Sequence, residues 1–185
     1  MAGFSQSNDQ PSIEDLHNEL RAIKQRAVDA VNSGSAEDLL GTFSQNIIIT
    51  AFNNDNVHGL DAATEYYGKM MTGADRYIKE MSITADADAL SLFYADNTIA
   101  VVSGTSMAHF QLKVGPPFDI PLRWTATVDR SSGSWKFATL HFSADPVDNP
   151  LVSSSIAFWK WLAVALALGG VGLGYFLGRR KSRKA

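Results

Sequence analysis

The feature that most constrains the fold is a change of pattern near residue 78. Before it, apolar residues such as Leu16, Leu20 and Ile23 recur at three- and four-residue steps, which predicts helices. After it come segments rich in β-branched and aromatic residues, separated by turn residues, which predict strands over 78–85, 90–94, 98–114, 120–129 and 135–143. Helices followed by an antiparallel meander predict an α+β domain, with the helices on one face of a curved sheet.

The helical part has clear start and stop signals. Ser12 is a predicted N-cap, Glu14 and Asp15 follow in the first turn, and Gly34 ends the apolar pattern. The next elements are expected to be a short helix over 36–43, a strand over 46–52 and a helix over 61–71. We expect the whole chain to comprise a disordered leader (1–10), the α+β domain (11–145), a linker (146–155), a membrane helix (156–178) and a basic tail (179–185).

Charge is distributed unevenly along the 185 residues. Residues 1–155 hold ten basic and nineteen acidic side chains, a net charge of −9, whereas the remainder holds six basic side chains and no acidic one. An acidic domain argues against a nucleic-acid partner, because phosphate contacts require clustered Lys and Arg. The absence of cysteine excludes disulfides, thiol catalysis and cysteine-ligated metal centres.

The C-terminal region carries the longest apolar run. Residues 156–178 contain one charge, Lys160, and would form a helix of roughly 34 Å at about 1.5 Å per residue, enough for a hydrocarbon core of about 30 Å. Trp159 and Trp161 lie near its start, as interfacial aromatic residues do. We therefore expect a single transmembrane helix in contact with a lipid bilayer.

Two properties of this helix stay open. Gly170, Gly174 and Gly178 form a stripe of small residues at every fourth position, which either packs a second helix or reflects only the frequency of glycine in membrane helices. The N-terminal residues show no secretory signal, which favours a tail-anchored domain facing the cytosol. The positive-inside rule would instead keep the basic tail in the cytoplasm, so a translocated domain is the alternative.

Two stretches resemble motifs of a known superfamily. HGLDAATEYY (58–67) resembles the Gly-x-x-Ala start of a third helix, and RWTATVDRSSGSWKFATLHFS (123–143) resembles a last hairpin with Gly-x-Trp and a terminal His-x-Ser. With the order of elements, they make residues 12–145 similar to the SnoaL-like, or nuclear transport factor 2-like, superfamily. The resemblance implies a cone-shaped, bent antiparallel sheet wrapped by the helices around an apolar cavity, and a homodimer through the sheet.

The resemblance also implies a ligand site in the cone. If the strand over 135–143 is unbroken, Trp135 and His141 share a face, and because the Gly-x-Trp tryptophan faces the helices, His141 would line the cavity. His17, on the first helix, is expected at the surface. The expected ligand-binding residues are Tyr66, Tyr67, His109, Arg123, Trp124, Trp135 and His141.

Catalysis at this site has two candidates. His141 could act as an acid or base near neutral pH, and a carboxyl group at Asp119 in an apolar cavity would have a raised pKa and could accept a proton. The alternatives are that His141 only closes the cone through a hydrogen bond, and that Asp119 lies at a solvated edge beside Pro121.

Departures from the superfamily's steroid isomerases favour a non-catalytic role. Their proton-abstracting Asp and oxyanion-binding Tyr correspond to positions within 49–52 and near Ala27, where neither group is present. The sequence has no nucleophile elbow, phosphate loop, dinucleotide fingerprint or metal-ligand spacing, so we expect no cofactor and no metal.

Two functions follow from the sequence. The first is a membrane-anchored scaffold or binding module for a small hydrophobic ligand or a protein partner. The alternative is a cyclase-, isomerase- or hydratase-type enzyme with a lipid-soluble substrate. Convergence of His141 and Asp119 to within about 5 Å in a closed apolar cavity favours the enzyme, because acid and base must reach one substrate. A cavity filled by side chains would exclude it.

Overall fold

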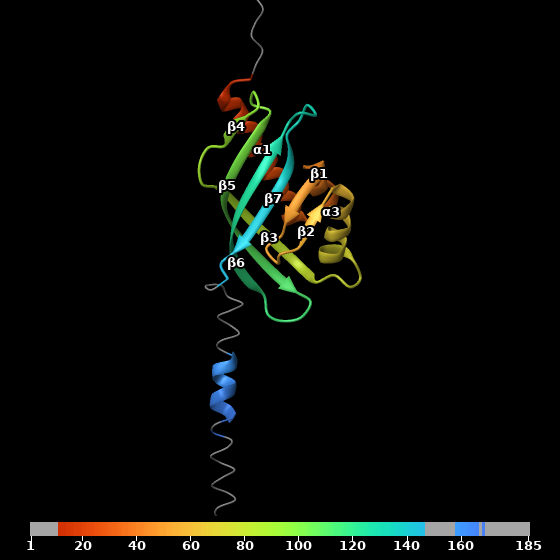
Figure 1. Ribbon diagram of the computed structural model, residues 1–185. Coiled ribbons are helices and arrows are strands. Elements are labelled where there is room, and N and C mark those ends of the chain that lie inside the picture. The colour runs from red at the N-terminus through yellow and green to blue at the C-terminus, as the bar shows by residue number, and fades with distance from the viewer. Residues whose placement is uncertain (1–10, 147–157, 167, 169–185) are drawn as a thin grey trace, which may run out of the picture. The chain divides into compact units, whose positions relative to one another are not determined.

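The computed structural model describes residues 11–146, 158–166 and 168. The chain divides into two compact units, Met1–Ala144 and Asp145–Ala185. The predicted leader (1–10) and all of the predicted linker except residue 146 lie outside the described residues. In the first unit, Figure 1 shows long, curved strands with α1 running behind them and α3 beside β1 and β2.

The order of elements follows the predicted change from helices to strands. The helical elements are α1 (Ile13–Ser33), α2 (Ala36–Leu40), α3 (Leu60–Tyr67) and the π-helical turn η1 (Gly68–Thr72). The strands are β1 (Phe43–Thr50), β2 (Asn56–His58), β3 (Ile78–Ala87), β4 (Leu92–Tyr94), β5 (Ile99–Leu112), β6 (Phe118–Asp129) and β7 (Lys136–Ala144).

Helix α1 begins and ends where the sequence predicts. The Ser12 side chain accepts a hydrogen bond from the Asp15 backbone N–H, and the Asp15 carboxylate accepts one from the Ser12 backbone, which completes a capping box. This bonding lowers the pKa of Asp15, the Ser12 side chain being the main cause. Gly34 ends the helix in the left-handed conformation (φ 71°), which glycine adopts without steric cost.

The sheet is mixed, which corrects the expectation of a purely antiparallel sheet. Its strand order is β2-β1-β7-β6-β5-β3, with β4 paired to one end of β5. All pairs are antiparallel except that of β1 with β7, which is parallel; β7 comes back beside β1 at the end of the meander. Strand β2 was not predicted; its three residues pair with the end of β1.

A β-bulge in β7 overturns the predicted strand parity. Thr127 pairs with Thr139, but the next residue of β6, Val128, pairs with Phe137, so that Ala138 is an extra residue in β7. Phe137 is buried, whereas His141, four residues further on, is exposed. Two residues an even number of positions apart, such as Phe137 and His141, therefore face opposite surfaces of the sheet when the bulge lies between them.

The inner face of the sheet carries the core. Along β6 the buried residues alternate with exposed ones: Ile120, Leu122, Trp124, Ala126 and Val128 are buried. Opposite Trp124, β5 has Gly104, where an added Cβ would lie 1.9 Å from the Asp86 carbonyl oxygen and 2.6 Å from the indole. Glycine at this position lets the indole lie across β5 and donate from Nε1 to the Thr105 carbonyl oxygen (2.9 Å).

Helix α1 also covers the free edge of the sheet. Strand β3 is the last strand of the order and has an unpaired edge. The Asn32 amide donates to the Ile83 carbonyl oxygen (3.0 Å) and accepts from the Ile83 N–H (2.7 Å), and Lys24 Nζ donates to the Ala85 carbonyl oxygen (2.6 Å). These side chains replace part of a missing strand, which satisfies edge groups that would otherwise pair with another chain.

In the second unit, residues 158–166 and 168 are helical. The rest of the predicted membrane segment 156–178, its glycines Gly170, Gly174 and Gly178, and the basic tail lie outside the described residues. Within the described part of the chain, no helix has the length and apolar character that crossing a membrane requires.

Candidate functional site

The first unit has a cavity of about 220 Å³ on the inner face of the sheet. Its walls come from α1, α2, α3, η1 and strands β1, β3, β5, β6 and β7, and include members of both buried clusters of the core. The lining residues are Lys24, Ala27, Val28, Val31, Leu39, Leu40, Phe43, Ile49, Ala51, Phe52, Ala63, Tyr66, Tyr67, Met70, Met71, Ile78, Met81, Ile83, Ala85, Ser106, Phe110, Leu122, Trp124, Phe137, Leu140 and Phe142.

The cavity wall is almost entirely hydrocarbon. Of the described residues that line it, Lys24 alone carries a formal charge, and no Asp, Glu or His is among them. Met70 and Met71, on η1, add unbranched and adaptable side chains to the wall. Such a surface favours an apolar ligand, because water in it would find few hydrogen-bond partners.

Two phenols from α3 reach this wall. Burial raises the pKa of Tyr66 above its ordinary value, and the nearby Asp55 carboxylate adds to the rise; the Tyr66 hydroxyl lies 3.4 Å from Asn53 Oδ1. Burial likewise raises the pKa of Tyr67. Both side chains therefore stay protonated at neutral pH, as hydrogen-bond donors and not as bases.

One place in the wall combines two polar groups. Lys24 Nζ donates to the Ala85 carbonyl oxygen, and Ala85 pairs across the sheet with Ser106. Ser106 is buried (5% exposed), and its Oγ has no hydrogen-bond partner among the described residues. Directly paired residues have their Cβ atoms about 4.5–5.5 Å apart, so Ser106 lies beside the small side chain of Ala85. The ammonium lies on the other side of Ala85, at the free edge of β3, where it binds the carbonyl oxygen.

Three of the predicted ligand-binding residues line the cavity: Tyr66, Tyr67 and Trp124. Trp135 does not line it. Its side chain is buried in the core, where Nε1 donates to Glu19 Oε2 on α1 (2.8 Å), and the Arg130 guanidinium lies 5.5 Å from the ring centroid. Trp135 faces the helices, as the resemblance implies, but it packs the fold and does not contact the cavity.

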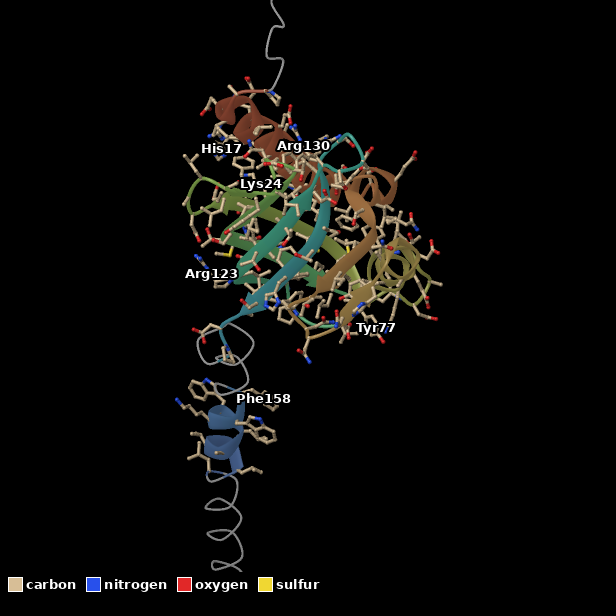
Figure 2. The ribbon with its side chains drawn as sticks, turned by 45° about the horizontal axis from the view of Figure 1, so that its top comes forward. His17, Lys24, Tyr77, Arg123, Arg130 and Phe158 are labelled. Carbon is tan, nitrogen blue, oxygen red and sulfur yellow. The ribbon has the colours of Figure 1, made fainter. Side chains whose placement is uncertain are left out.

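The other predicted residues lie on the outer face of the sheet. His109 Nδ1 is 2.6 Å from Asp119 Oδ1, on neighbouring strands, and both side chains are largely exposed. Arg123 forms two hydrogen bonds with the Asp88 carboxylate, one of them from Nη1 to Oδ1 at 3.1 Å. Figure 2 shows the Arg123 side chain projecting outward from the sheet, and Lys24 on α1.

The predicted acid–base pair is thus not assembled in the cavity. The bulge at Ala138 places His141 on the exposed face, and Asp119 binds His109 instead. Pro121 does not break β6; it lies just beyond the last β6–β7 pair, where a missing N–H donor is tolerated. Asp119 and Arg123 therefore share a face, but it is the face away from the ligand cavity.

A smaller pocket of about 80 Å³ adjoins the same helix. It shares Lys24, Trp124 and Phe137 with the main cavity, and its wall also includes Arg21 and His17. The expectation that His17 lies at the surface is wrong: the residue is 6% exposed, and its ring centroid lies 5.0 Å from that of Phe93. Lys24 therefore stands between a hydrocarbon cavity and a more polar pocket.

Sequence reasoning missed Lys24 and Ser106. Lys24 follows Ile23 and lies four residues after Leu20, so a charged residue interrupts the apolar stripe of α1. Ser106 shares strand parity with the buried Ala108 and Phe110. Both signals, a charge and a hydroxyl at inward-facing positions, are visible in the sequence once strand and helix faces are assigned. Across the described residues, no group of three or more His, Asp or Glu side chains could hold a metal ion.

Comparisons with known proteins bear on the fold. At the level of sequence, no family profile matches the chain and no curated protein is significantly similar to it. Solved structures do match. A candidate dehydratase of the nuclear transport factor 2-like family from Streptomyces avermitilis has a TM-score of 0.62 at 13% identity, over 74% of this chain and 100% of that one.

Two further solved structures of similar fold have different names. A candidate scytalone dehydratase from Novosphingobium aromaticivorans has a TM-score of 0.59 at 16% identity, over 70% of this chain and 91% of that one. A ketosteroid isomerase-like protein from Erwinia carotovora atroseptica has a TM-score of 0.56 at 14% identity, over 69% and 95%. These values show that the first unit has the nuclear transport factor 2-like fold, and at such identities they show the fold alone.

Proposed function

We propose that this chain is a binding module that holds a small hydrophobic molecule in the cavity of its first unit, without catalysing a reaction on it. The observation that carries the proposal is an open cavity of about 220 Å³ with hydrocarbon walls, to which none of the Asp, Glu and His residues of the described chain contributes. Asp, Glu and His are among the commonest general acids and bases of enzymes. The cavity offers shape and apolar surface instead.

The size of the cavity sets the size of the ligand. Pockets for drug-sized molecules occupy roughly 300–1,000 Å³. A cavity of about 220 Å³ suits a molecule smaller than a steroid, such as a short aliphatic chain or a single ring. Met70 and Met71 can adapt to either shape, since their side chains have several rotatable bonds.

Mass spectrometry of small molecules retained by the purified full-length chain tests this proposal. We expect the wild-type protein to release a hydrophobic compound on denaturation. Ala27→Phe, which would fill the cavity from α1, should abolish its retention. The matched control is Thr125→Phe, which adds the same ring to the exposed face of β6 and should retain the compound as the wild type does. Equal retention by the two variants would place the compound elsewhere.

A second candidate function is favoured by the solved structures of similar fold, whose names include dehydratases and an isomerase-like protein. In an enzyme of that kind, the ionisable groups available in the cavity would be Lys24, Tyr66 and Tyr67. A retained compound that is converted by the wild type but not by a Tyr67→Phe variant would favour the enzyme over the binding module.

We propose further that residues 156–178 anchor the chain to a bilayer and that the first unit pairs with a second copy through its sheet. The support for the anchor is the sequence itself, with 23 residues and a single charge. Extraction of membranes at alkaline pH tests it: a chain ending at residue 145 should be released, and the full chain should stay in the pellet. Sedimentation of the released fragment would then report its oligomeric state.

A further inference from the structure

We propose that the ligand is a hydrophobic carboxylic acid, whose carboxylate binds Lys24 and Ser106 at Ala85 while its apolar part fills the cavity. This inference rests on the proposed binding function and specifies the chemical class of its ligand. It follows from three observations on α1, β3 and β5.

The first observation is an ammonium group at the wall of an apolar cavity. Lys24 is half-buried and lines the cavity, and the one hydrogen bond recorded for its Nζ goes to a neutral acceptor, the Ala85 carbonyl oxygen. The ion pairs formed among the described residues do not include Lys24. Because an ammonium has three N–H donors, two remain available to an anion.

The second observation is an orphaned hydroxyl. Ser106 lines the cavity at 5% exposure, and no group in the described part of the chain forms a hydrogen bond with its Oγ. A buried polar group without a partner destabilises the fold, so one that persists calls for an explanation such as a ligand. A hydroxyl can donate to a carboxylate oxygen, as the ammonium does.

The third observation is that these two groups adjoin one residue. Ala85 binds Lys24 through its carbonyl oxygen and pairs with Ser106 across the sheet. Alanine leaves room between the two groups that a larger side chain would fill. Two donors in the wall of a hydrocarbon cavity, on either side of Ala85, match a molecule with a single anionic end, because a carboxylate has two oxygens, one to accept from each donor.

The position of Lys24 makes an anion tolerable here. A carboxylate buried alone in hydrocarbon is strongly disfavoured, and pairing with an ammonium offsets that cost. Lys24 also borders the smaller pocket, which includes Arg21. The anionic end of the ligand would thus lie at the more polar boundary of the cavity, and its apolar part against residues such as Leu140 and Phe142.

Calorimetric titration of the full-length chain with octanoate and with octanamide tests the inference. The two probes have the same chain and nearly the same shape, but only octanoate is charged at neutral pH. We expect octanoate to bind about tenfold more tightly than octanamide, as befits a charge-assisted hydrogen bond. Lys24→Met, which keeps an unbranched side chain at the wall, should reduce octanoate binding to the level of octanamide. The control Lys79→Met, at an exposed position of β3, should leave the ratio unchanged.

Ser106→Ala separates the hydroxyl from the charge. We expect this variant to bind octanoate several-fold more weakly than the wild type. Its affinity for octanamide should change less. Lys24→Arg should restore part of the preference that Lys24→Met removes, because a guanidinium keeps the positive charge. An unchanged preference in both Lys24→Met and Ser106→Ala overturns the inference.

The outcomes distinguish this inference from the proposed function. Equal binding of octanoate and octanamide, abolished for both by Ala27→Phe, would keep the hydrophobic binding site and reject the carboxylate. Binding of either probe that Ala27→Phe does not affect would reject the cavity as the binding site, and the carboxylate with it.

Discussion

The two faces of the sheet in the first unit differ in burial and in chemistry. Along β5 and β6, successive residues alternate between two surfaces. One surface faces the hydrocarbon cavity, and the other is solvated and carries charged side chains. The inner face holds Trp124 and the Ser106 hydroxyl, which has no hydrogen-bond partner within the described residues. The outer face holds the pair formed by His109 and Asp119. The titratable residues that the sequence offers for catalysis, such as Asp119, therefore lie on the face of the sheet opposite the cavity.

This difference shows how strongly function in a sheet depends on side-chain parity. A strand has a period of two, so one extra residue moves every later side chain to the other face. At Ala138 a single bulge is enough to place His141 in solvent and Leu140 in the cavity wall. Substitutions on the inner face should therefore change stability and binding, and those on the outer face should change little.

The largest effect is expected at Gly104. Gly104→Ala would place a Cβ 1.9 Å from the Asp86 carbonyl oxygen and 2.6 Å from the Trp124 ring, so backbone or indole must move. We expect a loss of about 3 kcal/mol in the free energy of unfolding, measured by urea denaturation. The control Thr105→Ala, one residue away on the outer face, should cost less than about 0.5 kcal/mol. Similar losses of stability in Gly104→Ala and Thr105→Ala would contradict the expected difference between the two faces.

The second-largest effect, at Ser106, is an expected gain in stability. Ser106→Ala removes a buried hydroxyl without a partner, so the ligand-free protein should gain about 1 kcal/mol, which corresponds to a rise of about 2–4 °C in Tm. Ser143→Ala, on the exposed face of β7, should leave Tm unchanged. A fall in Tm for Ser106→Ala would mean that the hydroxyl is satisfied within the protein, and it would remove one support of the carboxylate site.

A smaller effect is expected from the outer ion pair. His109→Ala, Asp119→Asn and the double variant form a cycle whose coupling energy should be at most about 0.5 kcal/mol, because both side chains are largely exposed. None of the three should alter ligand retention. Loss of retention in Asp119→Asn would return this carboxylate to the binding site and contradict the assignment of the faces.

The smallest effect concerns alkaline pH. Because burial raises the pKa of Tyr67, its folded state holds the phenolic proton more tightly than the unfolded state does. The associated stability is present below the ordinary tyrosine pKa of about 10 and is lost as the pH rises above it. Tyr67→Phe should therefore lose less stability than the wild type between pH 8 and pH 10.5 in thermal unfolding. The exposed Tyr94→Phe should follow the wild type, and a steeper alkaline loss in Tyr67→Phe would be contrary to expectation.

Much of the fold could be predicted, because its signals are local. Ser12 and Gly34 mark the ends of α1 through capping groups within four residues, and the strands from β3 to β7 follow runs of β-branched and aromatic residues. The parallel pairing of β1 with β7 could not be predicted, because it joins segments almost a hundred residues apart and no local pattern encodes it. β2 is three residues long and exists only as a partner of β1.

The site was harder to predict than the fold. Tyr66, Tyr67 and Trp124 were placed by their position in recognisable motifs, and they line the cavity. His141 was misplaced because the bulge at Ala138 has no glycine or other local marker, so the strand looks unbroken in the sequence. The pairing of Ala85 with Ser106 needs the register of β3 against β5, which depends on a second bulge near Lys79.

A crystal structure of the full-length chain grown with octanoate would show whether the inner face binds a small hydrophobic ligand. We expect a chain of density in the cavity between Trp124 and Met71, with the carboxylate within hydrogen-bonding distance of Lys24 Nζ. An empty or collapsed cavity, or octanoate bound on the outer face beside His141, would contradict it.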